Sequence, residues 1–279
     1  MSVLKVENLV KNFGETVAVN DISFSCEAGE IVGFVGKNGA GKSTTIRCVL
    51  NFLAPTSGKC MIDELDSQKD AKQIRSLCAY MPSDSMFPSS ASAKDVFSLC
   101  LKFSTKSMQD VENLAKYFEL DINKKINELS LGNRKKVSII QALLAQKDLL
   151  ILDEPTSGLD PLMQDKFFKL LLEQKQNGKT IFLSSHNLSE IEKYCDRAII
   201  IKDGKIINEI DMKNTDFKKI QVVSYTLKTG EESSFESDES ANEIILRLSK
   251  MDLKSVEIRS KSVEDEFIKY YEEGDNNAK

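Results

Sequence analysis

A glycine-rich segment at residues 36–43 has the residue types and spacing that phosphate binding requires. Its sequence, Gly-Lys-Asn-Gly-Ala-Gly-Lys-Ser, fits the pattern G-x-x-x-x-G-K-[ST] in full, directly after an apolar run and before a helical pattern. Glycines let the backbone curve closely around a phosphate, and the N-terminus of the following helix adds positive potential. A chance glycine-rich turn is the alternative, which these flanks make less plausible. We predict nucleotide binding by Gly36, Lys37, Asn38, Gly39, Ala40, Gly41, Lys42, Ser43 and Thr44.

Within this segment, Lys42 is expected to meet the β and γ phosphates, and the Ser43 hydroxyl to meet Mg²⁺. Two carboxylates follow an apolar run at residues 149–152, where the ligand crevice of an open parallel sheet lies. Asp153 is predicted to hold the metal through water, and Glu154 to polarise an attacking water. A solvated strand end is the alternative, but the phosphate-binding segment favours the catalytic interpretation.

His186 is the only histidine of the chain, and it follows another apolar run at residues 180–185. A lone histidine is more often structural than catalytic. The carboxyl end of a strand reverses that preference, because side chains there face the ligand crevice. A neutral imidazole at this place would hydrogen-bond the γ phosphate and steady the water, so we predict a catalytic role.

The elements that must position these residues follow from the pattern of apolar side chains. Residues 4–9, 22–26 and 31–35 predict strands, and the helical pattern after Gly41 extends to residue 53. Residues 92–147 are mainly helical. Alternation then returns, with strands at 149–153, 180–184 and 197–201, helices at 162–176 and 188–195, and a hairpin turn at residues 203–204. This order favours a parallel sheet with crossover helices.

The character of the sequence changes after about residue 212. A strand at 220–226, an acidic serine-rich stretch at 231–240, and helices near 244–248 and 263–271 predict a small appended domain. We therefore assign residues 1–211 to the main domain, with its helical part at about 85–147, and residues 212–279 to an accessory domain.

Composition bounds the kind of protein. The chain has 279 residues, 41% hydrophobic and 29% charged, which is typical of a folded globular protein. Its longest apolar runs are too short to span a bilayer, and no secretory signal is visible, so a cytoplasmic location is expected. The six cysteines show no C-x-x-C spacing and are interpreted as buried apolar residues in a reducing compartment. The net charge of −5 argues against a general nucleic-acid coat.

Together with residues 129–133, Leu-Ser-Leu-Gly-Asn, these motifs resemble the ABC ATPase family over about residues 3–210. The order and spacing of Ser130, Asp153 and His186 are similar to those of the family's signature, second acidic motif and switch histidine. The resemblance implies an α/β fold of the P-loop NTPase type: an ABC cassette with an antiparallel β subdomain, a parallel-sheet core, a helical subdomain and a small C-terminal α+β extension. The implied cofactors are ATP and Mg²⁺.

The resemblance also implies that two active sites form only in a dimer, in which the signature segment of one subunit caps the nucleotide of the other. The segment is Ser130, Leu131, Gly132 and Asn133. The Ser130 hydroxyl and the Gly132 N–H at a helix start can bind a γ phosphate. In isolation, an ordinary helix N-cap is the alternative interpretation of this segment. Phe13 stands where the family places an aromatic that stacks on adenine, and a core aromatic is its alternative. Asp160 belongs to a loop resembling the dimer-contact loop, and a simple turn is its alternative.

Two departures from the family pattern change the expectation. Leu131 replaces the first glycine of the usual LSGGQ and Asn133 replaces its glutamine, while Ser83 stands where a glutamine normally contacts the metal. We therefore predict a slower or differently coupled ATPase, with Asp84 as a candidate substitute for the missing contact.

The predicted partners are an integral-membrane permease and a second cassette, identical or different, so the protein is expected to lie peripherally on the inner face of the membrane. The tail at residues 262–267 resembles the end of single-cassette bacterial exporters of the drug and bacitracin type, which favours export. One rival interpretation is a soluble ABC-type ATPase that acts on nucleic acid or ribosomes, and a second is a non-catalytic nucleotide sensor. No nucleic-acid partner is expected.

Overall fold

The computed structural model describes residues 2–84, 86–212, 220–262, 264–265 and 267–268. The chain forms two compact units, Met1–Ile210 and Asp211–Lys279. Among the described residues, no helix is both long enough and apolar enough to cross a lipid bilayer. Each unit has its own core and is described separately.

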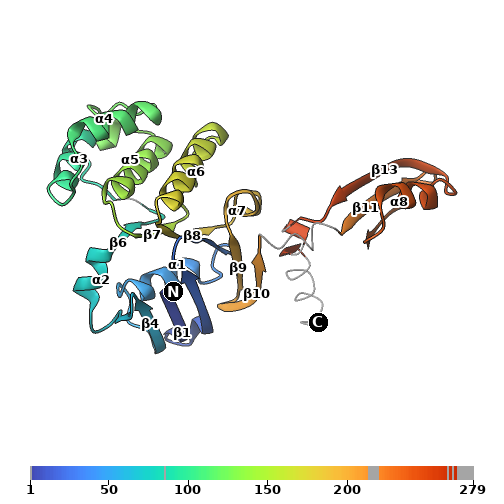
Figure 1. Ribbon diagram of the computed structural model, residues 1–279, viewed down its shortest axis with the longest axis horizontal. Coiled ribbons are helices and arrows are strands. Elements are labelled where there is room, and N and C mark those ends of the chain that lie inside the picture. The colour runs from blue at the N-terminus through green and yellow to red at the C-terminus, as the bar shows by residue number, and fades with distance from the viewer. Residues whose placement is uncertain (1, 85, 213–219, 263, 266, 269–279) are drawn as a thin grey trace. The chain divides into compact units, whose positions relative to one another are not determined.

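The central sheet of the larger unit has the strand order β10-β9-β3-β8-β7-β6 (Figure 1). Pairing is parallel between β3 and its neighbours β8 and β9, and between β7 and its neighbours β6 and β8. Every residue of β3, β7 and β8 is buried, as in parallel sheets with both faces covered. The carboxyl ends of these strands therefore meet at one edge. The bounds are β3 Ile31–Val35, β6 Cys78–Met81, β7 Leu149–Asp153, β8 Thr180–Ser185, β9 Arg197–Lys202 and β10 Lys205–Asp211.

An antiparallel sheet with the order β2-β1-β4-β5 packs against this core. Its strands are β1 Ser2–Phe13, β2 Thr16–Glu27, β4 Ser57–Ile62 and β5 Leu65–Asp66. Phe24 of β2 stacks on Phe34 of β3 and on Phe182 of β8, with ring centroids 5.5 and 5.4 Å apart. This cluster of aromatic rings joins the two sheets.

Helices cover the central sheet between its strands. These helices are α1 Lys42–Val49, α2 Ala71–Leu77, α6 Pro161–Gln176 and α7 Leu188–Tyr194. α1 ends earlier than the sequence pattern predicts, because Leu50 leaves the helical conformation and Asn51 has a φ of 54°. The apolar side chain of Leu53 still packs against the core, which explains why the periodicity extends beyond the helix.

The predicted helical region lies together at one end of the larger unit, next to α6 (Figure 1). It consists of α3 Ala93–Leu101, α4 Met108–Tyr117, the short 3₁₀ helix η1 Ile126–Glu128 and α5 Leu131–Leu144. Ser92 and Asp95 form a capping box at the start of α3, so two N-terminal backbone N–H groups find side-chain acceptors. α3 and α4 each contact α5, and α5 also contacts β6. The predicted fold class is confirmed.

The smaller unit is a sheet with the order β12-β11-β13 and one packed helix. Its elements are β11 Gln221–Leu227, β12 Glu232–Ser237, α8 Ala241–Leu248 and β13 Leu253–Ser260. The predicted strand and the helix near 244–248 are present. The sequence pattern did not predict β12 and β13, because serines and charged residues on their exposed faces hide a clear alternation of apolar residues. The helix predicted at 263–271 lies partly outside the described residues.

Candidate functional site

The glycine-rich segment connects β3 to α1, so strand, loop and helix follow as predicted. Lys42 is buried, and its Nζ donates to the carbonyl oxygens of Gly36 at 2.6 Å and Lys37 at 3.3 Å. Gly41 has a φ of 107°, and a Cβ there would lie 2.6 Å from the Ala18 carbonyl oxygen. A side chain at Gly41 would therefore be both strained and obstructed. The loop holds the Lys42 ammonium group inside its own curve.

Asp153 is fully buried at the end of β7, beside Ser184 of β8 in the parallel register. Its Oδ1 accepts hydrogen bonds from the Ser43 hydroxyl at 3.0 Å and the Ser184 hydroxyl at 2.6 Å. Its Oδ2 is buried and has no hydrogen-bond partner among the described residues. A buried carboxylate oxygen of this kind is costly unless a cation or donor completes the site. Asp153 and Ser43 thus form an incomplete set of oxygen ligands.

Glu154 adopts a φ of 49°, which turns its side chain away from the strand direction. Its backbone N–H donates to the Ser184 hydroxyl at 3.0 Å, which helps hold this conformation. One carboxylate oxygen lies 3.2 Å from Lys42 Nζ, and the other lies 2.7 Å from His186 Nδ1. Because a carboxylate oxygen only accepts, Nδ1 carries the hydrogen in this contact. Glu154 therefore lies between Lys42 and His186, two of the residues for which the sequence predicts a role in the site.

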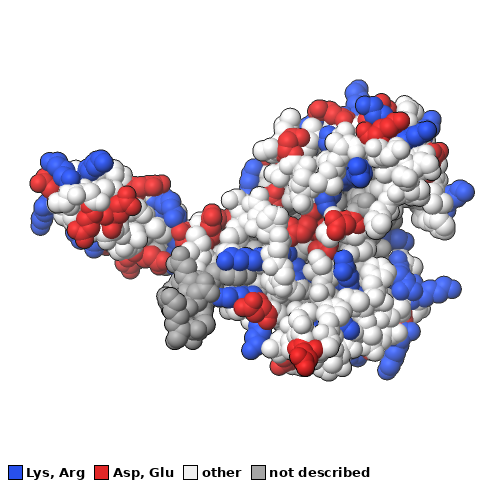
Figure 2. Space-filling model, turned by 180° about the vertical axis from the view of Figure 1, so that it is seen from behind, with Lys and Arg blue, Asp and Glu red and all other residues white. Residues whose placement is uncertain are grey.

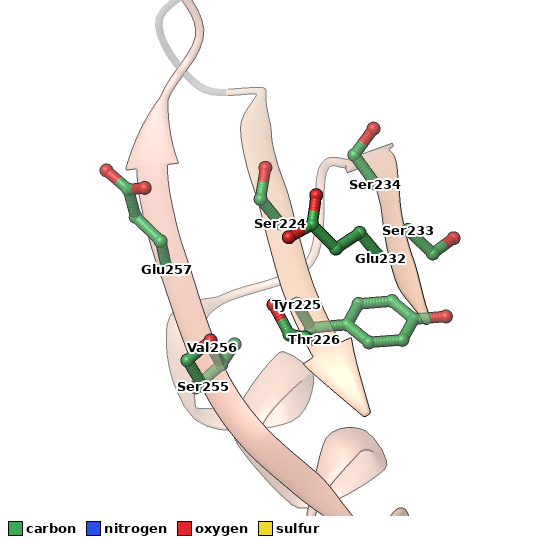
Figure 3. A pocket seen from close by; sticks show the side chains of 9 residues that line it. All are labelled: Ser224, Tyr225, Thr226, Glu232, Ser233, Ser234, Ser255, Val256 and Glu257. Carbon is green, nitrogen blue, oxygen red and sulfur yellow. The ribbon is translucent and has the colours of Figure 1, made fainter. Parts of the chain in front are cut away.

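Lys42, Ser43 and Glu154 face a cavity of about 250 Å³ at the carboxyl ends of the strands. A larger cavity, of about 520 Å³, lies on the sheet of the smaller unit (Figure 3). Its lining is made of hydroxyl, carboxylate and apolar side chains, without lysine or arginine among the described residues. Of these two cavities, the smaller is the candidate nucleotide site, because only it is lined by residues of the glycine loop and by a lysine. It is lined by Ala18, Asn38, Gly39, Gly41, Lys42, Ser43, Thr44, Ser83 and Glu154.

Comparison with known proteins agrees with this geometry. Residues 19–157 match the family model described as ABC transporter. The bacitracin transport ATP-binding protein of Bacillus licheniformis is 34% identical over 75% of this chain and 70% of its own length. The Nod factor export ATP-binding protein I of Rhizobium etli is 31% identical over 75% of this chain and 68% of its own length. This chain belongs to the ABC transporter ATP-binding proteins.

A solved structure described as the ATP binding subunit of an ABC transporter has a TM-score of 0.70 with this chain. It is 28% identical in sequence and covers 78% of this chain and 92% of its own. The protein is therefore an ATP-binding and ATP-hydrolysing subunit of the ABC type. The aligned share corresponds in size to the larger unit.

In this ABC ATPase the signature-like segment opens α5 and does not line the cavity. Ser130 caps the helix by accepting a hydrogen bond from the Asn133 N–H at 3.3 Å. A Cβ at Gly132 would lie 2.8 Å from the Gly158 carbonyl oxygen, so only glycine fits there without a shift. Leu131 is 70% exposed. The segment thus packs closely against the loop that precedes α6 and presents an apolar side chain outward.

Asp160 and Phe13, which the resemblance also pointed to, lie on the surface outside the cavity lining. The Asp160 carboxylate caps α6 by accepting a hydrogen bond from the Met163 N–H at 3.0 Å. Within one chain, Asp160 therefore belongs to a turn that precedes a helix. Phe13 is 49% exposed at the end of β1, with Lys11 Nζ 5.0 Å from its ring centroid. Phe13 is therefore a half-exposed surface aromatic rather than a core one.

The structure adds polar groups that the sequence reading missed. Ser184 bridges Asp153 and the Glu154 backbone, as described above, and Glu190 of α7 is buried nearby. The Glu190 carboxylate accepts from the Thr156 hydroxyl at 2.8 Å and the Ser185 hydroxyl at 3.5 Å, and burial raises its pKa. The acidic side chain thereby ties the loop after β7 to the end of β8. The only feature of the sequence that could have indicated Glu190 is a glutamate on the buried face of the helix that follows His186.

Lys135 of α5 is a second buried lysine near the cavity. Its Nζ donates to the Ser83 carbonyl oxygen at 2.7 Å. Burial lowers its pKa, and the carboxylates of Asp153, Asp84 and Glu154 counteract part of that effect. Asp84 itself is exposed and is not among the residues that line the cavity. Ser83 does line it.

Proposed function

We propose that this ATPase subunit pairs with a second cassette around two Mg-ATP and drives a separate membrane permease in the export direction. The proposal rests on one observation: Lys42 and Ser43 of the glycine loop line one cavity together with Glu154, whereas no residue of the signature-like segment beginning at Ser130 in the same chain is among its lining. A second cassette would bring such a segment to the nucleotide, so that each site is completed by both subunits.

The Asp153 Oδ2 atom supports a bound Mg²⁺, because it is a buried oxygen with no partner among the described residues. The Ser43 hydroxyl lies 3.0 Å from the other oxygen of the same carboxylate. Oxygen ligands of this kind suit Mg²⁺, which normally keeps several waters and binds one or two protein groups plus phosphates. We assign Ser43 and Asp153 to the metal, and we propose Ser83, which lines the same cavity, as a third contact. The ion would neutralise charge on the phosphates.

The protein's own groups would supply the remaining chemistry. Lys42 and the N–H groups of the glycine loop would bind the phosphates. The Glu154 carboxylate would accept a hydrogen bond from the attacking water and so polarise it. His186 holds the second oxygen of Glu154 and orients the carboxylate. Hydrolysis removes the γ phosphate that both subunits hold, which reopens the dimer and converts chemistry into motion.

The membrane partner is proposed from the family and the fold. The helical region α3–α5 would pass the motion of the cassette to the permease. The protein would then lie peripherally on the inner face of the membrane. The relatives named for bacitracin transport and Nod factor export support export. We assign residues 1–211 to the cassette and 212–279 to an accessory domain. Acidic and basic side chains are interspersed on the face shown in Figure 2, which suits a protein partner better than a nucleic-acid backbone.

A pull-down tests this function. Tagged Glu154→Gln protein is incubated with ATP and detergent-solubilised native membranes, and co-purified proteins are identified by mass spectrometry. A multi-spanning permease, absent when Lys42→Ala protein is used as bait, is the expected result. Recovery of ribosomes or soluble partners alone, with the cassette missing from the membrane fraction, would contradict the proposal.

Restoring the family's glutamine should change turnover. Ser83 lines the cavity, but its hydroxyl is shorter than a glutamine side chain and reaches less far toward a metal. We expect Ser83→Gln to change ATP turnover by about threefold or more, either basal or with the permease present, since second-shell and metal contacts have effects of this size or larger. Steady-state phosphate release measures it. Ser90→Gln, at an exposed residue that does not line the cavity, is the control. Unchanged turnover in Ser83→Gln under both conditions would remove Ser83 from the metal site.

A further inference from the structure

The buried amine of Lys135 lies where the signature-bearing helix meets the wall of the nucleotide cavity. α5 begins at Leu131, directly after the Ser130 cap, and Lys135 follows one turn later. Its side chain runs inward, so that only 5% of the residue is exposed. The ammonium group donates to the Ser83 carbonyl oxygen at 2.7 Å. One helix therefore carries the signature segment at its start and a tether to the cavity wall.

The loop that receives this hydrogen bond needs an external support. It leaves β6 after Met81 and contains Pro82, which has no backbone N–H to donate. Met86, further along the same loop, is 94% exposed and so contributes little packing. A charge-assisted hydrogen bond to a carbonyl is among the stronger single contacts available to such a segment. The bond from Lys135 is therefore well placed to fix where Ser83 lies.

The cost of burying this cation indicates that its position serves a purpose beyond filling space. An ammonium group removed from water is unfavourable unless paired or hydrogen-bonded. The carboxylates that stabilise its charge, Asp153 and Glu154, belong to the catalytic edge of the sheet, and Asp84 belongs to the tethered loop. A methionine of similar length would pack in the same space without that cost. The lysine thus links three parts of the site electrostatically.

We propose that Lys135 is a positioning residue, which holds the Ser83 loop against α5 so that Ser83 meets the nucleotide-bound metal and moves together with the signature segment. The proposal rests on the function proposed above and deepens it. In this chain the side chain at position 83 is short, so the placement of the loop backbone decides whether its hydroxyl reaches the cavity. Lys135 does not contact the nucleotide in this scheme; it acts through Ser83.

The chain offers a clean reporter and a matched control. It contains no tryptophan, so Met86→Trp gives a single tryptophan, on the tethered loop, which can be excited selectively. Lys136 is also a buried lysine, one position further along α5 and 9% exposed, and it has no bond to Ser83 among those described. Lys135→Met and Lys136→Met, both in the Met86→Trp background, therefore remove the same group from neighbouring positions of one helix.

We expect Lys135→Met to lower the fluorescence anisotropy of the reporter in the nucleotide-free protein, and Lys136→Met to leave it unchanged. The Mg²⁺ concentration that half-saturates ATP binding should rise about tenfold in Lys135→Met only, as for other outer-shell partners of metal ligands. ATP affinity without Mg²⁺ should stay within about twofold, because the phosphate loop is untouched. The melting temperature, measured in parallel, reports any general loss of stability.

Equal anisotropy and equal Mg²⁺ dependence in the two methionine variants would overturn the proposal. If Lys135→Met does not fold, Lys135→Arg serves in its place: it keeps a cationic donor and should preserve the anisotropy and the Mg²⁺ dependence, and failure to preserve either would count against the tether. Absence of Mg²⁺-dependent ATP binding in the parent protein would instead refute the proposed function. The two failures are thus distinguishable.

Discussion

Replacing Glu154 with glutamine is expected to reduce the turnover number for ATP about 100-fold or more while ATP affinity stays within about threefold. The amide keeps the size of the side chain and one oxygen near Lys42 or His186, but it cannot accept a proton, and general-base groups typically contribute factors of this size. Single-turnover hydrolysis and equilibrium ATP binding, measured on the same preparation, separate the two effects.

Glu119 provides a closely matched control for this substitution. It too is a glutamate with positive φ, at 56°, and its carboxylate lies 2.7 Å from a lysine, Lys166. It is exposed and does not line the nucleotide cavity. Glu119→Gln should therefore hydrolyse ATP at the parent rate. Near-normal turnover in Glu154→Gln would show that another group activates the water.

His186 should act with Glu154 as one unit. The distance of 2.7 Å between His186 Nδ1 and the carboxylate means that either substitution disturbs the same arrangement. The combined variant, Glu154→Gln with His186→Ala, should then be little slower than the slower of the two single variants, because groups that act together are non-additive. Effects that multiply would instead indicate that His186 works independently, for example by contacting the γ phosphate directly.

The parts of the site that the sequence predicted are those determined by local pattern. In the segment 36–43, Gly39 and Gly41 have positive φ, which glycine adopts most readily, and a Cβ at Gly36 would collide with the Ile201 carbonyl oxygen; β7 is an uninterrupted apolar run that ends in Asp153. Parallel pairing then brings the ends of β3, β7 and β8 together without further information. This is why the phosphate loop, both carboxylates and His186 could be placed before the structure was known.

The groups that the sequence did not reveal depend on packing between distant segments. Lys135 reaches Ser83 across 52 residues of chain, and Ser184 reaches Asp153 across 31. A lysine on a helix normally indicates a solvated face, and only the packing of α5 against β6 shows that this one is buried. The strands β12 and β13 were missed for a related reason, since one face of their sheet is polar and hides the alternation on the other.

Substituting Asp153 with asparagine is expected to abolish most of the effect of Mg²⁺ on ATP binding and to slow hydrolysis about 100-fold, or roughly 2.7 kcal/mol of transition-state stabilisation. Asparagine preserves the shape of the side chain, and its carbonyl oxygen can still accept from Ser43 and Ser184. The change therefore removes the negative charge and puts an NH₂ group, which donates and cannot bind a cation, at the buried Oδ2 position. ATP binding titrated with and without Mg²⁺ separates metal binding from phosphate binding.

Asp148 directly precedes β7 and is exposed, so Asp148→Asn controls for loss of a carboxylate next to this strand. Without Mg²⁺, Asp153→Asn should bind ATP at least as well as the parent, because a buried negative charge near the phosphates has been removed. The substitution should therefore weaken ATP binding with Mg²⁺ but not without it, and this contrast is the decisive result. Weaker binding under both conditions would mean that Asp153 mainly maintains the loop at Ser43, and the metal would then need other ligands.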